Sequence, residues 1–359
     1  MVGQHDTQQP LSEAVKQRKN VAEDGQGDIG RCEGAALPGC TWAAASILPT
    51  RLFARPMKPA AAPLSPFPAR FLRTAFDRRA TKWADADFLM REVASRLASR
   101  LDYIKLKPKR VLDIGCGTGG DLLAFGERYP DAYRVGLDAS YGMASAAAAA
   151  GVATGWRRLL RSTPPYGIVQ ADFSALPFAP RAFDLVWSNL ALHWYREPHR
   201  VIPEWHRVLS TDGLLMFSAY GPDTLRELRA AWAEVDDVPH GLEPTDMHDL
   251  GDMMVASGFD TPVTDMERLT LTFETPDTLL RDVRLLGVNP LPERRSGLTG
   301  RDRLAALRAA LERQRGDDGT ISLTFELVYG HAWKVPEKTD AAGNAVVRIQ
   351  DIGRGGRPR

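Results

Sequence analysis

VLDIGCGTGG, residues 111–120, decides the fold: a short apolar segment that contains one acid, Asp113, runs into a loop that holds four glycines. An apolar strand followed by a glycine loop is typical of a doubly wound α/β sheet, in which ligands bind at the carboxyl ends of the strands. Gly115, Gly117 and Gly120 also satisfy G-x-G-x-x-G, which occurs in loops that bind a dinucleotide pyrophosphate. The loop pattern alone therefore does not decide whether the ligand is a phosphate.

Apolar runs and amphipathic stretches alternate along the chain after this loop. Strands are expected in YRVGLDAS, ending on Asp138, in IVQADF, ending on Asp172, and in FDLVWSNLALHW and GLLMFSAYG. Helices are expected between these strands, and VTDMERLTLTF and TISLTFELVYGHAWKV supply two more extended segments. This alternation predicts an α/β fold with a doubly wound, mostly parallel, seven-stranded sheet.

The folded domain is expected to span residues 67–335, with a helical cap at 275–318 over the strand ends. Residues 1–66 and 336–359 lack convincing periodicity, which predicts a disordered tail at each end. The first 56 residues are rich in Gln, Gly, Asp and Ala and unlike the rest. We therefore expect the functional chain to start near Met57.

Composition limits the classes of function. The chain has 359 residues, 44% of them hydrophobic, and a net charge of +1, which argues against general electrostatic binding of nucleic acid. No apolar run approaches the ~18 residues that a membrane helix requires. The three cysteines show no C-x-x-C spacing, so neither a disulfide framework nor a zinc site is expected. These features favour a cytoplasmic protein.

Asp113, two residues before the first glycine, distinguishes between the two kinds of ligand. A carboxylate there would repel a pyrophosphate but attract a ligand that carries an ammonium and a sulfonium group. S-adenosylmethionine is such a ligand, because the glycines let the backbone approach its methionine part and Asp138 can accept from both ribose hydroxyls. Asp172 can accept from the adenine amine while Phe173 flanks the ring. The predicted cofactor is therefore S-adenosylmethionine.

Four elements occur in register: D-x-G-x-G-x-G, an acid at the end of the second strand, ADF, and FDLVWSNLALHW. In this combination the chain resembles the class I methyltransferases, which have a Rossmann-like sheet. The residues and the resemblance together give a cofactor site that consists of Asp113, Gly115, Gly117, Gly119, Asp138, Asp172, Phe173 and Asn189.

Five further stretches bear on the substrate. They are FDRRA (76–80), SAYGPDTLRELR (218–229), TDMHDLGDMMVASGF (245–259), RDVRLLGVNP (281–290) and LTFELVYGHAW (323–333). Together they resemble the malonyl-[acyl-carrier protein] O-methyltransferases of biotin synthesis over residues 70–335. The resemblance implies methyl transfer to the free carboxylate of a malonyl thioester on acyl-carrier protein, which gives the methyl ester that primes pimeloyl synthesis.

A carboxylate is already ionised and nucleophilic at pH 7, so this reaction needs no general base. Arg229 is the candidate to bind the carboxylate through two parallel hydrogen bonds, although a charge on a helix surface is the other interpretation. Trp83, where relatives often have tyrosine, is expected to face the methionine part of the cofactor. His193 is expected to line the pocket, with core packing as the alternative at this position. The seven histidines show no metal-ligand spacing, and no metal is expected.

The implied carrier protein is acidic, so a basic face is expected on this chain. The candidate residues form two groups, Arg157, Arg158 and Arg161, or Arg294, Arg295, Arg301 and Arg303, and a solvated charged surface is the alternative. The sequence assigns no oligomeric state.

Other functions fit the same motifs. FDR, SNLALHW, GPDTLRELR and HAWK also resemble a mitochondrial assembly factor of respiratory complex I that has this fold and is linked to arginine hydroxylation. A small-molecule or quinone methyltransferase, or a factor that binds the cofactor without turnover, is also compatible with the motifs. A neutral acceptor would need a base, for which His193 and His248 are the candidates.

Overall fold

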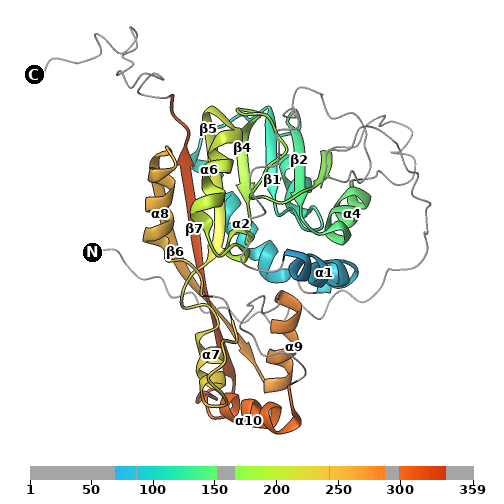
Figure 1. The fold of residues 1–359 in the computed structure, drawn as a ribbon, viewed down its shortest axis with the longest axis vertical. Helices are drawn as coiled ribbons and strands as arrows, with labels where there is room; N and C mark the ends of the chain where they lie inside the picture. The colour runs from blue at the N-terminus through green and yellow to red at the C-terminus, as the bar shows by residue number, and fades with distance from the viewer. Residues whose placement is uncertain (1–68, 86, 152–165, 242, 288–298, 337–359) are drawn as a thin grey trace, which may run out of the picture.

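The computed structural model describes residues 69–85, 87–151, 166–241, 243–287 and 299–336, which form one sheet with helices on both faces (Figure 1). The strands are β1 (Arg110–Ile114), β2 (Tyr133–Asp138), β3 (Tyr166–Gln170), β4 (Phe183–Ser188), β5 (Leu209–Tyr220), β6 (Asp260–Phe273) and β7 (Ile321–Trp333). Their order is β3-β2-β1-β4-β5-β7-β6, with β1 to β5 parallel and β7 antiparallel to both of its neighbours. The predicted seven-stranded, mostly parallel α/β sheet is confirmed.

Several helices begin at residues that cap them. The side chains of Ser140, Asp246 and Thr275 each accept a hydrogen bond from a backbone amide in the first turn that follows. The α-helices are α1 (Ala69–Arg79), α2 (Phe88–Arg100), α3 (Gly120–Arg128), α4 (Tyr141–Ala150), α6 (Pro198–Val208), α7 (Arg226–Ala233), α8 (Met247–Ala256), α9 (Pro276–Leu286) and α10 (Arg301–Glu312). Short 3-10 helices lie at Ala80–Asp85, Leu101–Tyr103 and Leu192–Trp194.

Consecutive residues of the central strands are buried in two different cores, so both faces of the sheet are covered. Leu112 and Val186 pack in one core with residues of α6 and α8. Val111 and Leu185 pack in the other with residues of α2 and α3. Parallel strands that are buried on both faces have near-continuous apolar runs. The segments VLDI and FDLVW show this pattern in the sequence.

β6 and β7 pair as two long antiparallel strands that extend beyond the rest of the sheet, and α7, α9 and α10 pack around their far end (Figure 1). We call this far end with its three helices the hairpin lobe. Helices were expected in this region, and α9 and α10 are present in its described part. In this described part, α10 packs against α7 and α9 at the far end of β6 and β7, and a cap over the strand ends stays a prediction. The C-terminal end of α9 reaches the strand ends, where Leu286 lines a pocket and the following residue, Gly287, packs against Trp194.

The third strand is shorter than the sequence predicts. β3 ends at Gln170, two residues before Asp172, because the Asp172 carboxylate turns the chain. Its Oδ1 accepts from the Ser174 amide at 2.9 Å and from the Ser174 hydroxyl at 2.6 Å.

Several predictions lie outside the described residues. They are the tail at 1–66, residues 337–359 of the second tail, the start at Met57, and the arginines at 157, 158, 161, 294 and 295. In the described part, no helix is long and apolar enough to span a membrane.

Candidate active site

A pocket lies at the carboxyl ends of β1, β2 and β4, where the strand order reverses. The glycine loop and the start of α3 form one wall, and α1 and the 3-10 helix Ala80–Asp85 close another side. The polar and aromatic residues that line it include Arg73, Phe76, Trp83, Asp121, Asp138, Asp172, Phe173, Asn189, His193, Trp194 and Tyr220. Most of the residues expected at the cofactor site therefore do lie together.

The glycine loop needs glycine where it turns. Gly115 has a φ of 77°, and a Cβ added there would lie 2.5 Å from the Cβ of Ala191. Gly117 has a φ of 53°, and its amide donates to the Asp138 carboxylate at 3.0 Å. Gly119, with a φ of 86°, precedes α3 and is not itself among the pocket-lining residues. The loop therefore brings the backbone close to the pocket.

Three carboxylates surround this loop, of which Asp113 is buried and Asp121 and Asp138 are partly buried. Asp138 ends β2 and also accepts from the Ser140 amide at 2.8 Å, and burial raises its pKa to about 6. Asp121, in the first turn of α3, accepts from the Trp187 indole at 2.8 Å, and burial also raises its pKa to about 6. Asp113 is 2% exposed, and burial together with the charges of Asp121 and Asp138 raises its pKa well above the ordinary value.

The carboxylates fit a cationic ligand. Asp121 and Asp138 line the pocket, whereas Asp113 lies behind them and Oδ2 of Asp113 has no hydrogen-bond partner among the described residues. A pyrophosphate at this position would meet the negative charges of Asp121 and Asp138, but a ligand with an ammonium and a sulfonium group would neutralise them. Sequence reasoning placed this acidic role on Asp113 and missed Asp121, because an acid in the first turn of a helix is ordinary.

The opposite end of the pocket is lined by Asp172 and Phe173. The Oδ2 of Asp172 lies 3.5 Å from the Arg73 guanidinium, and the Phe173 ring lies 5.4 Å from the ring of Tyr195. Asn189 also lines the pocket, but its side-chain amide is hydrogen-bonded to two other elements, α2 and β5. It donates to the Met90 carbonyl of α2 at 2.9 Å and accepts from the Ser218 hydroxyl of β5 at 2.7 Å.

Aromatic side chains enclose the pocket beside the glycine loop. Trp83 faces this loop, because a Cβ added to Gly117 would lie 3.8 Å from the indole nitrogen. The Phe76 ring makes edge contacts with Trp83 and Trp194, at centroid distances of 6.0 and 5.2 Å. These three rings exclude water from one side of the pocket.

Two hydrogen-bonded residues of α1 hold it in this place. Asp77 accepts from the Ser140 hydroxyl at 2.6 Å and from the Gly142 amide at 2.8 Å, at the start of α4. Arg79 donates to the carbonyls of Arg284 and Gly287, at 2.7 and 2.9 Å, at the end of α9. The helix that closes the pocket is thus fixed both to the sheet region and to the hairpin lobe.

His193 lies in the 3-10 helix Leu192–Trp194. Its side chain lines the pocket and is 9% exposed. Its ring centroid is 4.3 Å from that of Tyr220, the last residue of β5. Burial lowers the pKa of His193 to about 3 and raises that of Tyr220, so both side chains are neutral at pH 7. Tyr220 was not anticipated from the sequence, since only folding brings the end of β5 beside His193.

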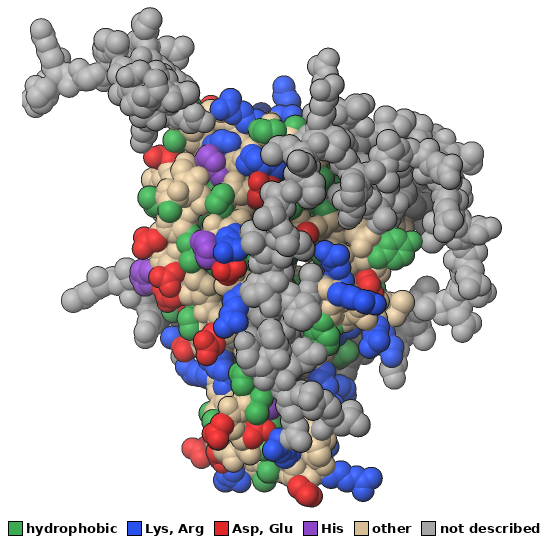
Figure 2. Space-filling view, viewed as in Figure 1, with side chains coloured by type: hydrophobic (Ala, Val, Ile, Leu, Met, Phe, Trp, Pro, Cys, Tyr) green, Lys and Arg blue, Asp and Glu red, His purple; other side chains and the backbone are tan. Residues whose placement is uncertain are grey.

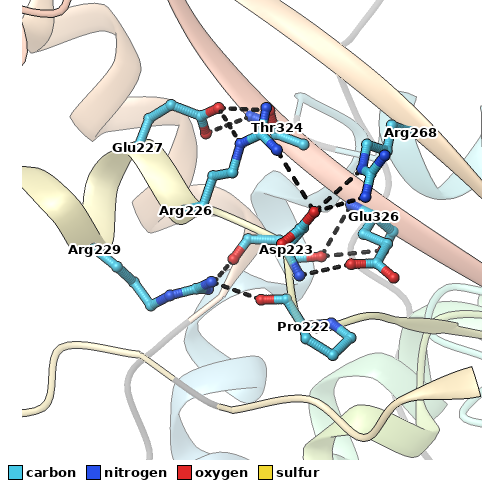
Figure 3. Close-up of polar contacts among 9 residues, drawn as sticks. Pro222, Asp223, Arg226, Glu227, Arg229, Arg268, Thr324 and Glu326 are labelled. Carbon is cyan, nitrogen blue, oxygen red and sulfur yellow. Dashed lines mark hydrogen bonds and ion pairs between the residues drawn. The ribbon is translucent and has the colours of Figure 1, made fainter.

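Arg229 is not brought to the pocket. Its guanidinium donates to the carbonyls of Pro222, at 2.6 Å, and of Thr224 (Figure 3). These hydrogen bonds stabilise the loop between β5 and α7, and the position of Arg229 does not match the predicted role of carboxylate ligand.

The same loop is joined to β7. Glu326, 6% exposed, accepts from the Asp223 amide at 2.6 Å (Figure 3). The Gly221 amide donates to the Glu326 carbonyl at 2.9 Å. A Cβ added to Gly221 would lie 2.5 Å from the Glu326 side chain. The GPDTLRELR stretch therefore has a structural role, because it connects the loop after β5 to β7 in the hairpin lobe.

Known proteins resemble this chain in sequence over most of its length. The family described as a methyltransferase domain matches residues 112–217. A malonyl-[acyl-carrier protein] O-methyltransferase of Laribacter hongkongensis is 44% identical over 264 residues, which cover 73% of this chain and 88% of the relative. One of Gallionella capsiferriformans is 43% identical over 281 residues, with 77% and 94% covered. Among solved structures, the YcgJ protein of Bacillus subtilis covers 67% of this chain and 98% of its own, at 18% identity and a TM-score of 0.46.

These relatives are named as methyltransferases, so they do not favour the alternative that the motifs belong to a complex I assembly factor. The methyltransferase domain and the methyltransferase relatives make S-adenosylmethionine the cofactor of this chain, as predicted. With such identity over most of both chains, the protein belongs to the malonyl-[acyl-carrier protein] O-methyltransferase family.

Proposed function

We propose that this chain transfers a methyl group from S-adenosylmethionine to the free carboxylate of a malonyl thioester on acyl-carrier protein. The product is the methyl ester that primes pimeloyl synthesis on the route to biotin. The observation that carries the proposal is the 44% identity to a malonyl-[acyl-carrier protein] O-methyltransferase, which extends over 88% of that relative.

The protonation states in the pocket support a carboxylate as the acceptor. His193 has a pKa lowered to about 3, so its neutral ring is a poor base at pH 7. Tyr220 stays protonated because burial raises its pKa. A neutral hydroxyl or a carbon acid would require a base, whereas a carboxylate is already ionised and nucleophilic. The pocket therefore suits an acceptor that reacts without proton transfer.

The cofactor supplies a methyl group on a positively charged sulfur, which leaves as a neutral thioether when the carboxylate oxygen takes the methyl. The residues of this chain align the reactants and exclude water. We assign the cofactor to Asp113, Gly115, Gly117, Gly119, Asp138, Asp172, Phe173 and Asn189, with Asp121 as an addition. We propose that Trp83, beside the glycine loop, and His193, in the 3-10 helix that follows β4, face the reacting groups.

The partner that we propose is a carrier protein in the cytoplasm. Charges of both signs are interspersed over the hairpin lobe, as Figure 2 shows on one face. Three arginines of this lobe are paired with acids: Arg303 with Asp236, Arg308 with Asp277, and Arg313 with Glu234. Of the predicted basic residues in the described part, exposed Arg301 therefore remains the better candidate to contact an acidic partner.

Incubation with isotopically labelled S-adenosylmethionine and malonyl-acyl-carrier protein tests the proposal. We expect label in a base-labile ester on the malonyl group, and growth of a biotin auxotroph that lacks its own methyltransferase when this chain is expressed. Absence of the ester together with failure to restore growth would remove the proposed function.

A further inference from the structure

A second cavity, of about 460 Å³, adjoins the cofactor pocket. It lies between the 3-10 helix Leu192–Trp194, the end of β5, and the segment that leads into α8, where Pro239 and Thr245 line it. His193, Tyr195 and Tyr220 line both cavities, so these three side chains form the junction between them.

The junction holds polar atoms that are buried and have no hydrogen-bond partner among the described residues. They include both ring nitrogens of His193 and the hydroxyls of Tyr195 and Tyr220. The rings of His193 and Tyr220 lie against each other, with centroids 4.3 Å apart and planes 37° apart. Buried polar groups are almost always hydrogen-bonded, so such a pair points to a ligand that supplies the missing acceptor.

We propose that His193 and Tyr220 bind the methyl-accepting carboxylate, and that the thioester arm reaches them through the second cavity. This inference rests on the proposed function and names the part of the chain that holds the substrate. The pair takes the role of carboxylate ligand that was predicted for Arg229, because the Arg229 guanidinium is hydrogen-bonded within the β5–α7 loop.

Neutral donors suit this task. A neutral imidazole donates through one ring nitrogen and a phenol donates through its hydroxyl, and a carboxylate accepts such bonds strongly because it is charged. Neither group carries a charge that would neutralise the nucleophile, and neither gives up its proton near pH 7. The carboxylate oxygen forms the new bond to the methyl carbon as the sulfur–carbon bond breaks, the electron pair stays on sulfur, and no proton moves.

Removal of one donor tests the inference. In Tyr220→Phe the ring remains but the hydroxyl is lost, so we expect the KM for malonyl-acyl-carrier protein to rise about tenfold. The dissociation constant for S-adenosylmethionine should not change, which also shows that the variant folds. Tyr103→Phe is the matched control, because Tyr103 is 91% exposed and lies in neither cavity.

The second cavity is tested separately with Thr245→Trp, which places an indole in it. We expect the KM for malonyl-acyl-carrier protein to rise, with unchanged affinity for S-adenosylmethionine. A KM unchanged in Tyr220→Phe overturns the role of the pair, and a KM unchanged in Thr245→Trp overturns the route of the arm. If the unmodified protein forms no malonyl methyl ester at all, the proposed function itself fails.

The pH profile separates a donor pair from a base. With two neutral donors and saturating S-adenosylmethionine, kcat/KM for malonyl-acyl-carrier protein should be constant between pH 6.5 and 8.5, because neither side chain titrates there. An ionisation in that range that disappears in His193→Phe would show that His193 acts as a base, and would contradict the inference.

Discussion

Single residues around the glycine loop give the pocket its charge. Asp113, Asp121 and Asp138 form one cluster, and removal from water opposes the ionisation of each. For Asp113 the charges of the other two carboxylates oppose it as well. Their ionised forms are thus costly in the free protein and favourable beside a cation. This cluster has consequences both for cofactor binding and for stability.

Binding of S-adenosylmethionine should weaken at low pH. Asp121 and Asp138 have pKa values of about 6 in the free protein, so each takes up a proton as the pH falls below 6, and protonation competes with the cationic ligand. We expect an affinity about tenfold lower at pH 5 than at pH 7 for each carboxylate that must ionise. Titration calorimetry over this range measures it, and a constant affinity would contradict the account.

Asp121→Asn should stabilise the free protein at pH 7 while it weakens cofactor binding. An acid whose pKa is raised in the folded state lowers the free energy of unfolding at pH values above this pKa. This stability is recovered as the pH falls towards the lower pKa that the acid has in the unfolded chain. We expect the free energy of unfolding at pH 7 to increase on the order of 1 to 3 kcal/mol. Asp131→Asn, at an exposed acid, should change neither stability nor affinity. Urea denaturation decides, and a destabilised Asp121→Asn would refute the cluster argument.

Arg229→Ala should act on stability rather than on substrate binding. The change removes two hydrogen bonds to the carbonyls of Pro222 and Thr224, worth about 1 to 2 kcal/mol together. Arg226→Ala, which removes only exposed ion pairs on the same helix, should cost less. Thermal unfolding compares the two. A large rise in KM for the malonyl substrate in Arg229→Ala, without loss of stability, would restore Arg229 as a ligand.

At the scale of elements, α1 is the helix on which the closed pocket depends. It supplies Phe76 to the aromatic wall, and its place is set by the bonds of Asp77 to α4 and of Arg79 to the end of α9. The hairpin lobe therefore contacts the cofactor pocket through this helix and through Leu286.

Asp77→Ala should release α1 from α4 and lower the affinity for S-adenosylmethionine about threefold to tenfold, because two hydrogen bonds are lost. Asp77→Asn keeps an acceptor oxygen and should retain most of the affinity. Arg78→Ala, at an exposed position of the same helix, is the control. Calorimetry at pH 7.5 measures the binding, and equal affinities for all three variants would show that this contact does not position the helix.

At the scale of the whole molecule, the fold was predictable because the central strands are apolar runs between recognisable helices. The place of Asp138, Asp172 and Phe173 in the pocket was predictable for a related reason, since each lies at or just after the end of a strand and the strand ends meet at one edge of the sheet.

The remaining site residues depend on contacts between distant segments. Tyr220 meets His193 only when the end of β5 packs beside the 3-10 helix that follows β4, and Arg73 reaches Asp172 from a helix about a hundred residues earlier. The side chain of Arg229 turns back onto its own loop, a direction that residue spacing does not encode. Sequence patterns thus predict where strands end more reliably than where long side chains point.

The identity of the methyl acceptor is the central claim, and one measurement tests it most directly. Malonyl-acyl-carrier protein and acetyl-acyl-carrier protein, which lacks the free carboxylate, are each incubated with S-adenosylmethionine and this protein, and the intact carrier is examined by mass spectrometry. We predict the gain of one methyl group on the malonyl carrier and no gain on the acetyl carrier. An unchanged malonyl carrier, or a methyl group on both, would contradict the account.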